Sequence, residues 1–492
     1  MTYSKQRLRE VLELKRTAVR HIQSDIGELG ASPSRKYIHE FNHEFQTFQA
    51  VCEPETVFEE ARTANLIWIG DYHALPRSQT YAAQFIRQLA AKNVNLALAV
   101  EPVFARSQKT LDHWMAGRIS EQEFLDGIRY QEEWGCDWSG YKAIFDTARE
   151  LRIPAYGVDC HPRNDMRSIS RRDLGVARRI ARLIEEDPSR CLVVVFGESH
   201  LATDHLPARV RAILQRKEIA LREVFVLQNV DSIYWKLQEQ GHHDARSVRV
   251  REGAYCVFNA TPIEKYESFR QYLHNCLGED SCGDWTLLAQ TLMEVMMDFL
   301  AMKKNDSVVS CMPMPELNPV MVDRFQLGSA AEEFARHIHQ ACRGELDRPA
   351  ERAANDQFFV NVIESGLGYF WSKLLDSSRD GIEPLAERVL GQIGRNDQLT
   401  RAIELLVDPS RRPGAQHFSV LRLAIEAKIG KQKTKRMLSE LLGYALGRRL
   451  YHAYLQSRIS RKEIQALFHD PLNTPNRPLE CYRELTERLV HD

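Results

Sequence analysis

From about residue 55 to residue 262, short apolar runs alternate with segments of helical periodicity, and this alternation leaves few architectures open. An uninterrupted run of large apolar residues is typical of a strand that is buried on both faces of a sheet. Strands that alternate with helices indicate a mainly parallel sheet flanked by helices, which is an α/β fold. The expected strands are residues 65–69, 95–100, 154–158, 191–196, 223–228 and 254–259.

The first of these runs ends in a glycine that an acid and an imidazole follow at once. Leu66–Ile69 is wholly apolar, and Gly70, Asp71 and His73 come directly after it. Glycine lets the backbone turn sharply and approach a ligand closely. Side chains just beyond the carboxyl end of a strand face the edge at which open α/β sheets bind their ligands. Asp71 and His73 are therefore candidate site residues.

Three further strands end in side chains of the same kind. Carboxyl ends of parallel strands share one edge, so these side chains could converge in a single crevice. Imidazole with carboxylate suits Zn, Mn or Fe(II), and a bound metal would lower the pKa of its water. The predicted ligands of a divalent transition metal are Asp71, His73, Glu101 and His200. Secondary candidates are Asp159, His161 and Glu198, the last also as a partner that orients His200.

The same positions have other interpretations. Acids at strand ends commonly cap helices, and histidines there commonly bond to the backbone. A serine nucleophile is a further alternative, because Gly197–Leu201 departs from the pattern GxSxG only in its last residue. Ser199 would then act with Asp231 and with His242 or His243. The chain has no GxGxxG after its first strand, no P-loop motif and no HExxH, which argues against the folds and sites that these motifs mark.

Composition argues against several classes of partner. Lys and Arg total 66 against 67 acids, a net charge of −1, so nothing calls for nucleic acid or an anionic membrane surface. The most apolar long stretch, residues 287–302, is too short and too polar to be inserted in a bilayer. The ten cysteines contain no CxxC pair, which is typical of reduced thiols. Because the first residues show no secretory signal or lipid-attachment cysteine, a cytoplasmic protein is expected.

Outside the alternating region the chain is predicted to be helical. Residues 1–50 form an N-terminal helical segment that packs on the main domain or makes an oligomer contact. The α/β domain is expected over residues 51–265, and a helical C-terminal region over residues 266–492. A Pro-rich stretch at residues 311–319 predicts a linker that could split this last region in two.

A series of short motifs runs through about residues 60–260. Gly-Asp-Tyr-His at residues 70–73 opens the series, Glu101 follows, and Gly-x-x-His at residues 197–200 closes it. Between them lie Gln108, Leu111, Asp112, Gly117, Phe124, Trp134, Trp138, Tyr141, Ala148 and Arg149. The series resembles that of the ChaN-like haem-binding-uptake domain, in the superfamily that also holds the Tiki proteases and the erythromycin esterases. Asp71 stands where the family has glutamate, so a bound metal or an activated water would sit differently.

The resemblance implies a protein that binds haem or iron at the strand-end crevice, with a homodimer as one arrangement. Tyr72 is then a candidate haem ligand by its chemistry. The alternative is a metal-dependent hydrolase of an ester or amide, in which His73 and Glu101 hold the metal or its water and one carboxylate acts as general base. A third hypothesis is a catalytically dead scaffold whose helical region holds the partner site. The residues alone do not separate an enzyme from a binding protein.

Overall fold

The computed structural model describes residues 3–28, 35–92, 95–160, 169–276, 286–302, 327–345, 350–376, 382–393, 397–407 and 432–490. The chain divides into two units. Residues 23–282 carry a β-sheet, and residues 1–22 with 283–492 are helical in their described part. Among the described residues, no helix combines the length and the apolar character that a membrane crossing requires.

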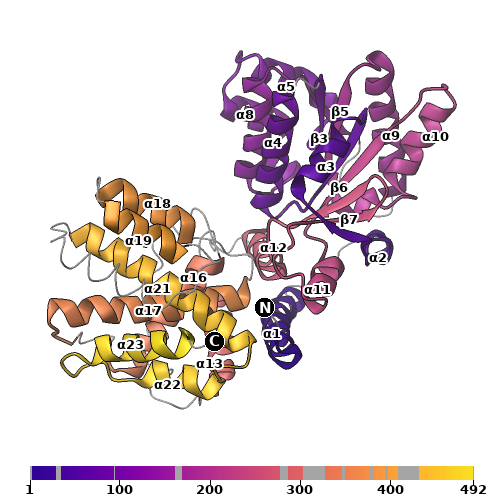
Figure 1. The fold of residues 1–492 in the computed structure, drawn as a ribbon. Helices are drawn as coiled ribbons and strands as arrows, with labels where there is room; N and C mark the ends of the chain where they lie inside the picture. Colours follow the sequence, from indigo (N-terminus) through magenta and orange to yellow (C-terminus); the bar gives the residue numbers. More distant parts are fainter. Residues whose placement is uncertain are drawn as a thin grey trace. The chain divides into compact units, whose positions relative to one another are not determined.

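The sheet has eight strands in the order β1-β7-β8-β6-β2-β5-β3-β4 (Figure 1). The strands from β8 to β4 run parallel, whereas β7 and β1 join antiparallel at one edge. The predicted α/β fold with a mainly parallel sheet is confirmed. The strands are β1 (Ala50–Cys52), β2 (Leu66–Asp71), β3 (Leu96–Phe104), β4 (Ala155–Asp159), β5 (Cys191–Gly197), β6 (Glu223–Gln228), β7 (Ser247–Arg251) and β8 (Ala254–Val257).

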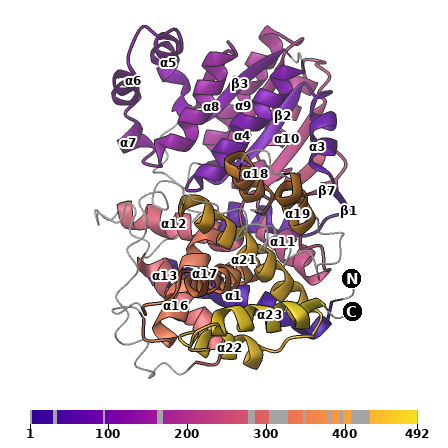
Figure 2. The same ribbon diagram turned by 60° about the vertical axis from the view of Figure 1, so that its left-hand side comes forward.

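The helices of this unit form a layer on each face of the sheet. They are α2 (Arg35–Glu44), α3 (Pro54–Ala61), α4 (Pro76–Ala91), α5 (Gln108–Met115), α6 (Glu121–Ile128), α7 (Tyr130–Glu133), α8 (Trp138–Glu150), α9 (Ile169–Glu186), α10 (Leu206–Gln215), α11 (Asp231–Glu239) and α12 (Pro262–Cys276), with short turns η1 (Ala105–Ser107) and η3 (Glu198–Leu201). Side chains of a strand alternate between its faces. On β2, Ile67 and Ile69 therefore pack in one core with α3, α4 and α8, and Leu66 and Trp68 pack in the other with α9 and α10 (Figures 1 and 2).

Helix α12 belongs to the sheet unit, which ends at residue 282 and not near residue 265 as expected. Lys265 Nζ lies 3.0 Å from Glu198 Oε1 and donates to the carbonyl of Asn229 at 3.1 Å. These bonds join the first turn of α12 to the ends of β5 and β6. The N-terminal boundary also differs from the expected one at residue 50, because residues 23–50 are part of this unit.

The second unit is a helical assembly. Beside the first part of α1 (Lys5–Glu28) it contains α13 (Thr286–Phe299), α16 (Leu327–Cys342), α17 (Ala354–Leu375), α18 (Ile382–Ile393), α19 (Asp397–Val407), α21 (Gln432–Leu455), α22 (Arg461–His469) and α23 (Arg477–Val490). Most of α17 is buried, and α21 lies beside it in both views (Figures 1 and 2). The expected helical C-terminal region is confirmed, and the Pro-rich stretch at 311–319 lies outside the described residues.

Candidate functional site

The strand order places a topological switch point between the neighbouring strands β2 and β5. From β2 the chain passes through α4 to β3, beyond β5, whereas from β5 it passes through α10 to β6, beyond β2. These two helices pack in the cores on opposite faces of the sheet. Such a point is where open α/β sheets bind their ligands. Asp71 and Gly197, the last residues of β2 and β5, are register partners across it.

A buried aspartate orients an accessible histidine at this point. His73 Nδ1 lies 2.8 Å from Asp71 Oδ2. The side chain of Asp71 is 2% exposed, whereas that of His73 is 34% exposed. Tyr141 and Gln79 also donate to the Asp71 carboxylate, each at 2.5 Å. Tyr141 and Gln79 fix the position of the carboxylate, and its contact with Nδ1 fixes the histidine ring.

Helices α4 and α8 supply the two supporting donors. Gln79 comes from α4 and Tyr141 from α8, and both are buried. Gly140 makes room for Gln79, because a Cβ at that glycine would lie 2.5 Å from Gln79 Oε1. Burial, and next the charge of Asp71, raise the pKa of Tyr141 well above its usual value. Tyr141 therefore stays protonated and remains a donor to Asp71.

Glu101 faces the other side of the same histidine ring. Its Oε2 accepts from the Gly197 amide at 2.6 Å and lies 3.7 Å from His73 Nε2. The register of β3 against β4 shifts between Val100 and Phe104, so Glu101 lies in an irregular stretch of the strand. Such irregularities re-aim a side chain. Gly197 allows this close approach, because a Cβ there would lie 3.1 Å from His73 Nε2 and the ring would have to shift.

A buried arginine links Glu101 to the end of β4. Arg172, on α9, bonds to Glu101 Oε1 and to both oxygens of Asp159, at 2.8 Å from Nε and 2.9 Å from Nη2. Burial alone would lower the pKa of Arg172, but the charges of Glu101 and Asp159 outweigh burial and raise it. The guanidinium is therefore a permanent charge. We call Asp71, His73, Glu101, Asp159 and Arg172 the switch-point site.

His200 lies in a separate cluster. Its Nδ1 is 2.7 Å from Asp173 on α9, and Tyr37 on α2 donates to the same carboxylate at 3.0 Å. The side chain of His200 is 6% exposed, so it is buried from solvent, whereas that of His73 is partly exposed. Glu198 pairs with Lys265 and does not orient His200. The structure thus brings together Asp71, His73, Glu101 and Asp159 from the predicted set, while His161 lies outside the described residues.

Tyr72 lies beside Lys265 of α12, which pairs with Glu198 and Asp231. Lys265 Nζ lies 4.6 Å from the centre of the Tyr72 ring, and Phe269 contacts the ring edge-on. Burial raises the pKa of Tyr72 above its usual value. Haem-binding tyrosines ligate iron as phenolates, so this environment works against Tyr72 as a ligand.

The donor set does not fit a bare metal ion. Among the described residues, no group of three or more His, Cys, Asp and Glu side chains is arranged to hold one. The carboxylates of Glu101 and Asp159 are paired with Arg172 and accept from backbone amides, so a metal ion would have to compete with a guanidinium for them. The predicted metal ligands therefore do not form a metal site in the described part of the chain.

One residue of the site, His73, has the chemistry of an axial ligand of haem iron. Haem iron needs one accessible axial donor, and imidazole is a common one. His73 is accessible, and its Nδ1 contacts the buried carboxylate of Asp71, the partner that a ligating histidine usually has. The ring centre of Trp134 lies 4.5 Å from that of His73, so an aromatic surface adjoins the imidazole.

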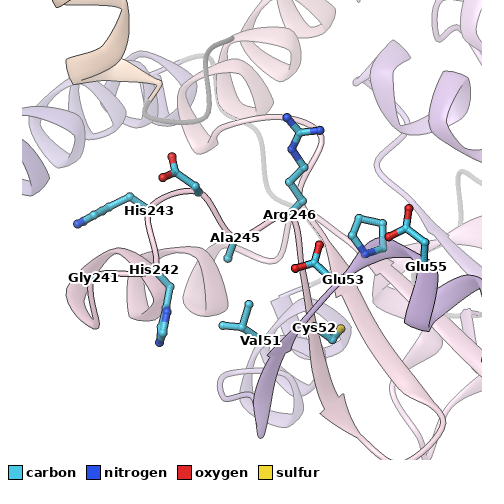
Figure 3. A pocket seen from close by; sticks show the side chains of 11 residues that line it. Val51, Cys52, Glu53, Glu55, Gly241, His242, His243, Ala245 and Arg246 are labelled. Atoms are coloured by element: carbon cyan, nitrogen blue, oxygen red, sulfur yellow. The ribbon is translucent and has the colours of Figure 1, made fainter. Parts of the chain in front are cut away.

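The serine-nucleophile alternative is not supported. Asp231 bonds to the Tyr266 hydroxyl and lies 3.7 Å from Lys265, so it orients no histidine. His242 and His243 belong to the loop before β7, at the far side of the sheet order from β5. Their side chains point away from each other in Figure 3.

That loop lines an open pocket of about 520 Å³ together with β1 and the start of α3 (Figure 3). None of the predicted metal or haem ligands lines it. Acids and bases are mixed around its wall, with Glu53, Glu55 and Asp244 beside Arg246. The pocket offers no converging donor set, and we assign it no role in the site.

Three residues that form or support the switch-point site carried little or no signal in the sequence. Tyr141 is part of the motif series, but its role as a donor to Asp71 was not predicted. Gln79 and Arg172 were not singled out at all, because a single polar residue on an amphipathic helix is ordinarily solvated. A test of whether such a residue falls on the buried face of its helix would have found Arg172, which lies among the inward residues of α9.

The family model that matches this chain agrees with the part of the motif series that it covers, from Gly70 to Arg149. The model of the family described as haem-binding uptake, Tiki superfamily, ChaN, matches residues 57–181, a segment that holds all five residues of the switch-point site. A solved structure of ChaN of Campylobacter jejuni, described as showing cofacial haem binding, is 14% identical, with 38% of this chain and 89% of that chain covered and a TM-score of 0.28. No curated protein matched the chain. Residues 57–181 are therefore a ChaN-like segment, similar to the haem-binding-uptake family.

Proposed function

We propose that the ChaN-like domain binds haem at the switch-point site, with His73 as the ligand of the haem iron. The observation that carries the proposal is the pairing of an accessible imidazole with a buried carboxylate at Nδ1. An anionic partner at Nδ1 raises the basicity of the ring and fixes its orientation, as is usual for ligating histidines. Haem-binding proteins are what the matched family description names.

Glu101 faces the nitrogen of His73 that the iron would take. Its carboxylate is fixed by Arg172 and the Gly197 amide, and it lies 3.7 Å from His73 Nε2. Asp71 fixes the ring at Nδ1, so iron would bind at Nε2 and replace the contact of that nitrogen with Glu101. A bound haem would take its iron ligand from an imidazole that is already oriented, which lowers the entropic cost of binding.

The test is a titration of haem into the purified chain, followed by visible absorption. Wild type is expected to give a saturable Soret shift. His73→Ala is expected to lose about tenfold or more in affinity, because an axial bond worth more than 1.4 kcal/mol is removed. His242→Ala, which removes an exposed imidazole elsewhere on the same unit, is the matched control and should bind as wild type does. Equal affinity for His73→Ala and wild type would reject His73 as the ligand.

Hydrolysis of an ester or amide is the second candidate function. It is favoured by one observation, the Asp71–His73 pair with Glu101 at 3.7 Å from Nε2. A histidine oriented by a buried carboxylate is the usual general base, and His73 and Glu101 would be its catalytic residues. Turnover of a generic ester that is lost in His73→Ala, without any Soret shift in wild type, would favour this function over haem binding.

The remaining expectations stay predictions of the sequence. They are the cytoplasmic location, the absence of nucleic acid as a partner, and the homodimer. A scaffold without activity would bind no haem and cleave no ester, so the two measurements above also decide that hypothesis.

A further inference from the structure

We propose that Arg172 is a resident cation that fills the place of a metal ion, so that the switch-point site excludes divalent metals. The guanidinium pairs with two carboxylates on neighbouring strands of the sheet, Glu101 within β3 and Asp159 at the end of β4. With the imidazole of His73 beside Glu101, these residues would otherwise be ordinary metal-ligating groups. The inference rests on the proposed function only in taking His73 as the ligand-binding group.

The carboxylates of Glu101 and Asp159 are both hydrogen-bonded to the Arg172 guanidinium. Arg172 presents its planar fork to Asp159 through Nε and Nη2, and Nη2 also reaches Glu101. Backbone amides also donate to both carboxylates, Gly197 to Glu101 Oε2 and Cys160 to Asp159 Oδ1, which accepts from Arg172 Nε as well. A metal ion would have to displace a fixed, always charged group and break backbone bonds as well.

Burial disfavours the replacement of the Arg172 guanidinium by a metal ion in the wild-type chain. The side chains of Glu101 and Asp159 are 2% and 0% exposed, and that of Arg172 is 10% exposed. A buried carboxylate pair needs a compensating cation, because unpaired buried charges are strongly destabilising. Arg172 supplies that charge from within the chain. The site is then complete without metal, and His73 is left as its accessible donor.

Arg172 is also a positioning residue for His73. It fixes Glu101, and Glu101 faces Nε2 of the imidazole at 3.7 Å. Removal of the guanidinium has two expected consequences. Glu101 gains freedom to move towards the imidazole, and two buried carboxylates are left to recruit another cation.

The experiment measures Zn²⁺ and Mn²⁺ binding to the full chain by equilibrium dialysis, in the absence of haem. Wild type is expected to bind no stoichiometric metal that depends on Glu101. Arg172→Ala is expected to gain stoichiometric binding, which Arg172→Ala/Glu101→Gln should lose. Arg171→Ala removes the exposed neighbouring arginine of the same helix and is the matched control, expected to behave as wild type. Added Zn²⁺ should raise the melting temperature of Arg172→Ala but not that of Arg171→Ala.

Two outcomes would overturn the proposal. One is stoichiometric metal in wild type that Glu101→Gln loses. The other is a folded Arg172→Ala protein, judged by circular dichroism, that gains no metal. If Arg172→Ala does not fold, wild type and Glu101→Gln decide the question by the first criterion, where equal and substoichiometric metal supports the proposal. Because no haem is present, this result stands apart from the success or failure of the haem titration.

Discussion

At the scale of the residue, the site depends on one carboxylate that several donors share. Asp71 accepts from Tyr141 and Gln79 and contacts His73 Nδ1, and each partner comes from a different element or turn. A hydrogen bond to a charged group contributes about 1.5–3 kcal/mol, more than a neutral one. Loss of one donor should therefore be measurable as a change in stability and not only as a change in ligand binding.

Tyr141→Phe tests this directly. The variant removes one donor from a buried carboxylate and should lower the free energy of unfolding by about 1.5–3 kcal/mol near neutral pH, measured by urea denaturation. Tyr81→Phe is the control, since among the described residues no hydrogen bond of the Tyr81 hydroxyl is seen, and it should change stability little. Equal effects of the two substitutions would contradict the role of Tyr141.

The same pair predicts a pH dependence. Burial and Asp71 raise the pKa of Tyr141 above the usual 10.0, so the folded protein favours the protonated phenol. Its stabilising contribution is complete below about pH 10 and is lost as pH rises through the raised pKa. The stability difference between wild type and Tyr141→Phe should therefore shrink in alkaline solution. A difference that grows above pH 10 would show that the sign is wrong.

Site residues that follow strands were predicted from the sequence, whereas the site residue on a helix was not. Asp71, His73, Glu101 and Asp159 follow directly on apolar runs, and the end of such a run marks them in the sequence. Arg172 lies on the buried face of α9, which the helical periodicity indicates, but its pairing with Glu101 and Asp159 depends on how α9 packs against the sheet. His200 was predicted to join the site, yet the 3-10 turn η3 directs it to Asp173 instead.

At the scale of the element, close helix packing makes its own prediction. An added Cβ at Gly447 on α21 would lie 2.3 Å from the Gly366 carbonyl oxygen on α17, so the two helices would have to separate. Gly447→Ala should cost about 1–3 kcal/mol in the helical unit, as overpacking usually does. Gly391→Ala on α18 is the control, because a Cβ there meets nothing within 4 Å and should stabilise the helix by up to about 1 kcal/mol. Urea denaturation followed by circular dichroism would show both, and two effects of the same sign would refute the packing argument.

The strongly apolar strands were predicted from the sequence, and the less apolar ones were missed. The expected strand at 223–228 coincides with β6, and the other buried parallel strands were found within a few residues. β7 was missed because Ser247–Arg251 alternates polar and apolar side chains and contains no continuous apolar run. β1 is three residues long and pairs only with β7, so its sequence carries no periodic signal.

At the scale of the whole molecule, the division into two units was visible in outline but not at its boundaries. The change from alternating to purely helical periodicity marks where strands stop. It does not show that α12 is bonded to the sheet through Lys265, or that residues 1–22 belong with the C-terminal helices. Such long-range assignments depend on contacts between segments that are distant in the sequence, which periodicity cannot report.

Each unit has its own buried core, and this predicts how the full chain melts. Differential scanning calorimetry should show two transitions, because a chain with two cores need not unfold in one step. Haem binds the folded ChaN-like domain in our proposal and should raise one transition only, in proportion to the logarithm of its concentration. Tyr141→Phe should lower that same transition, whereas Gly447→Ala should lower the other. If haem and Gly447→Ala shift the same transition, the two units unfold together, and the stability of the haem site then depends on the helical unit as well.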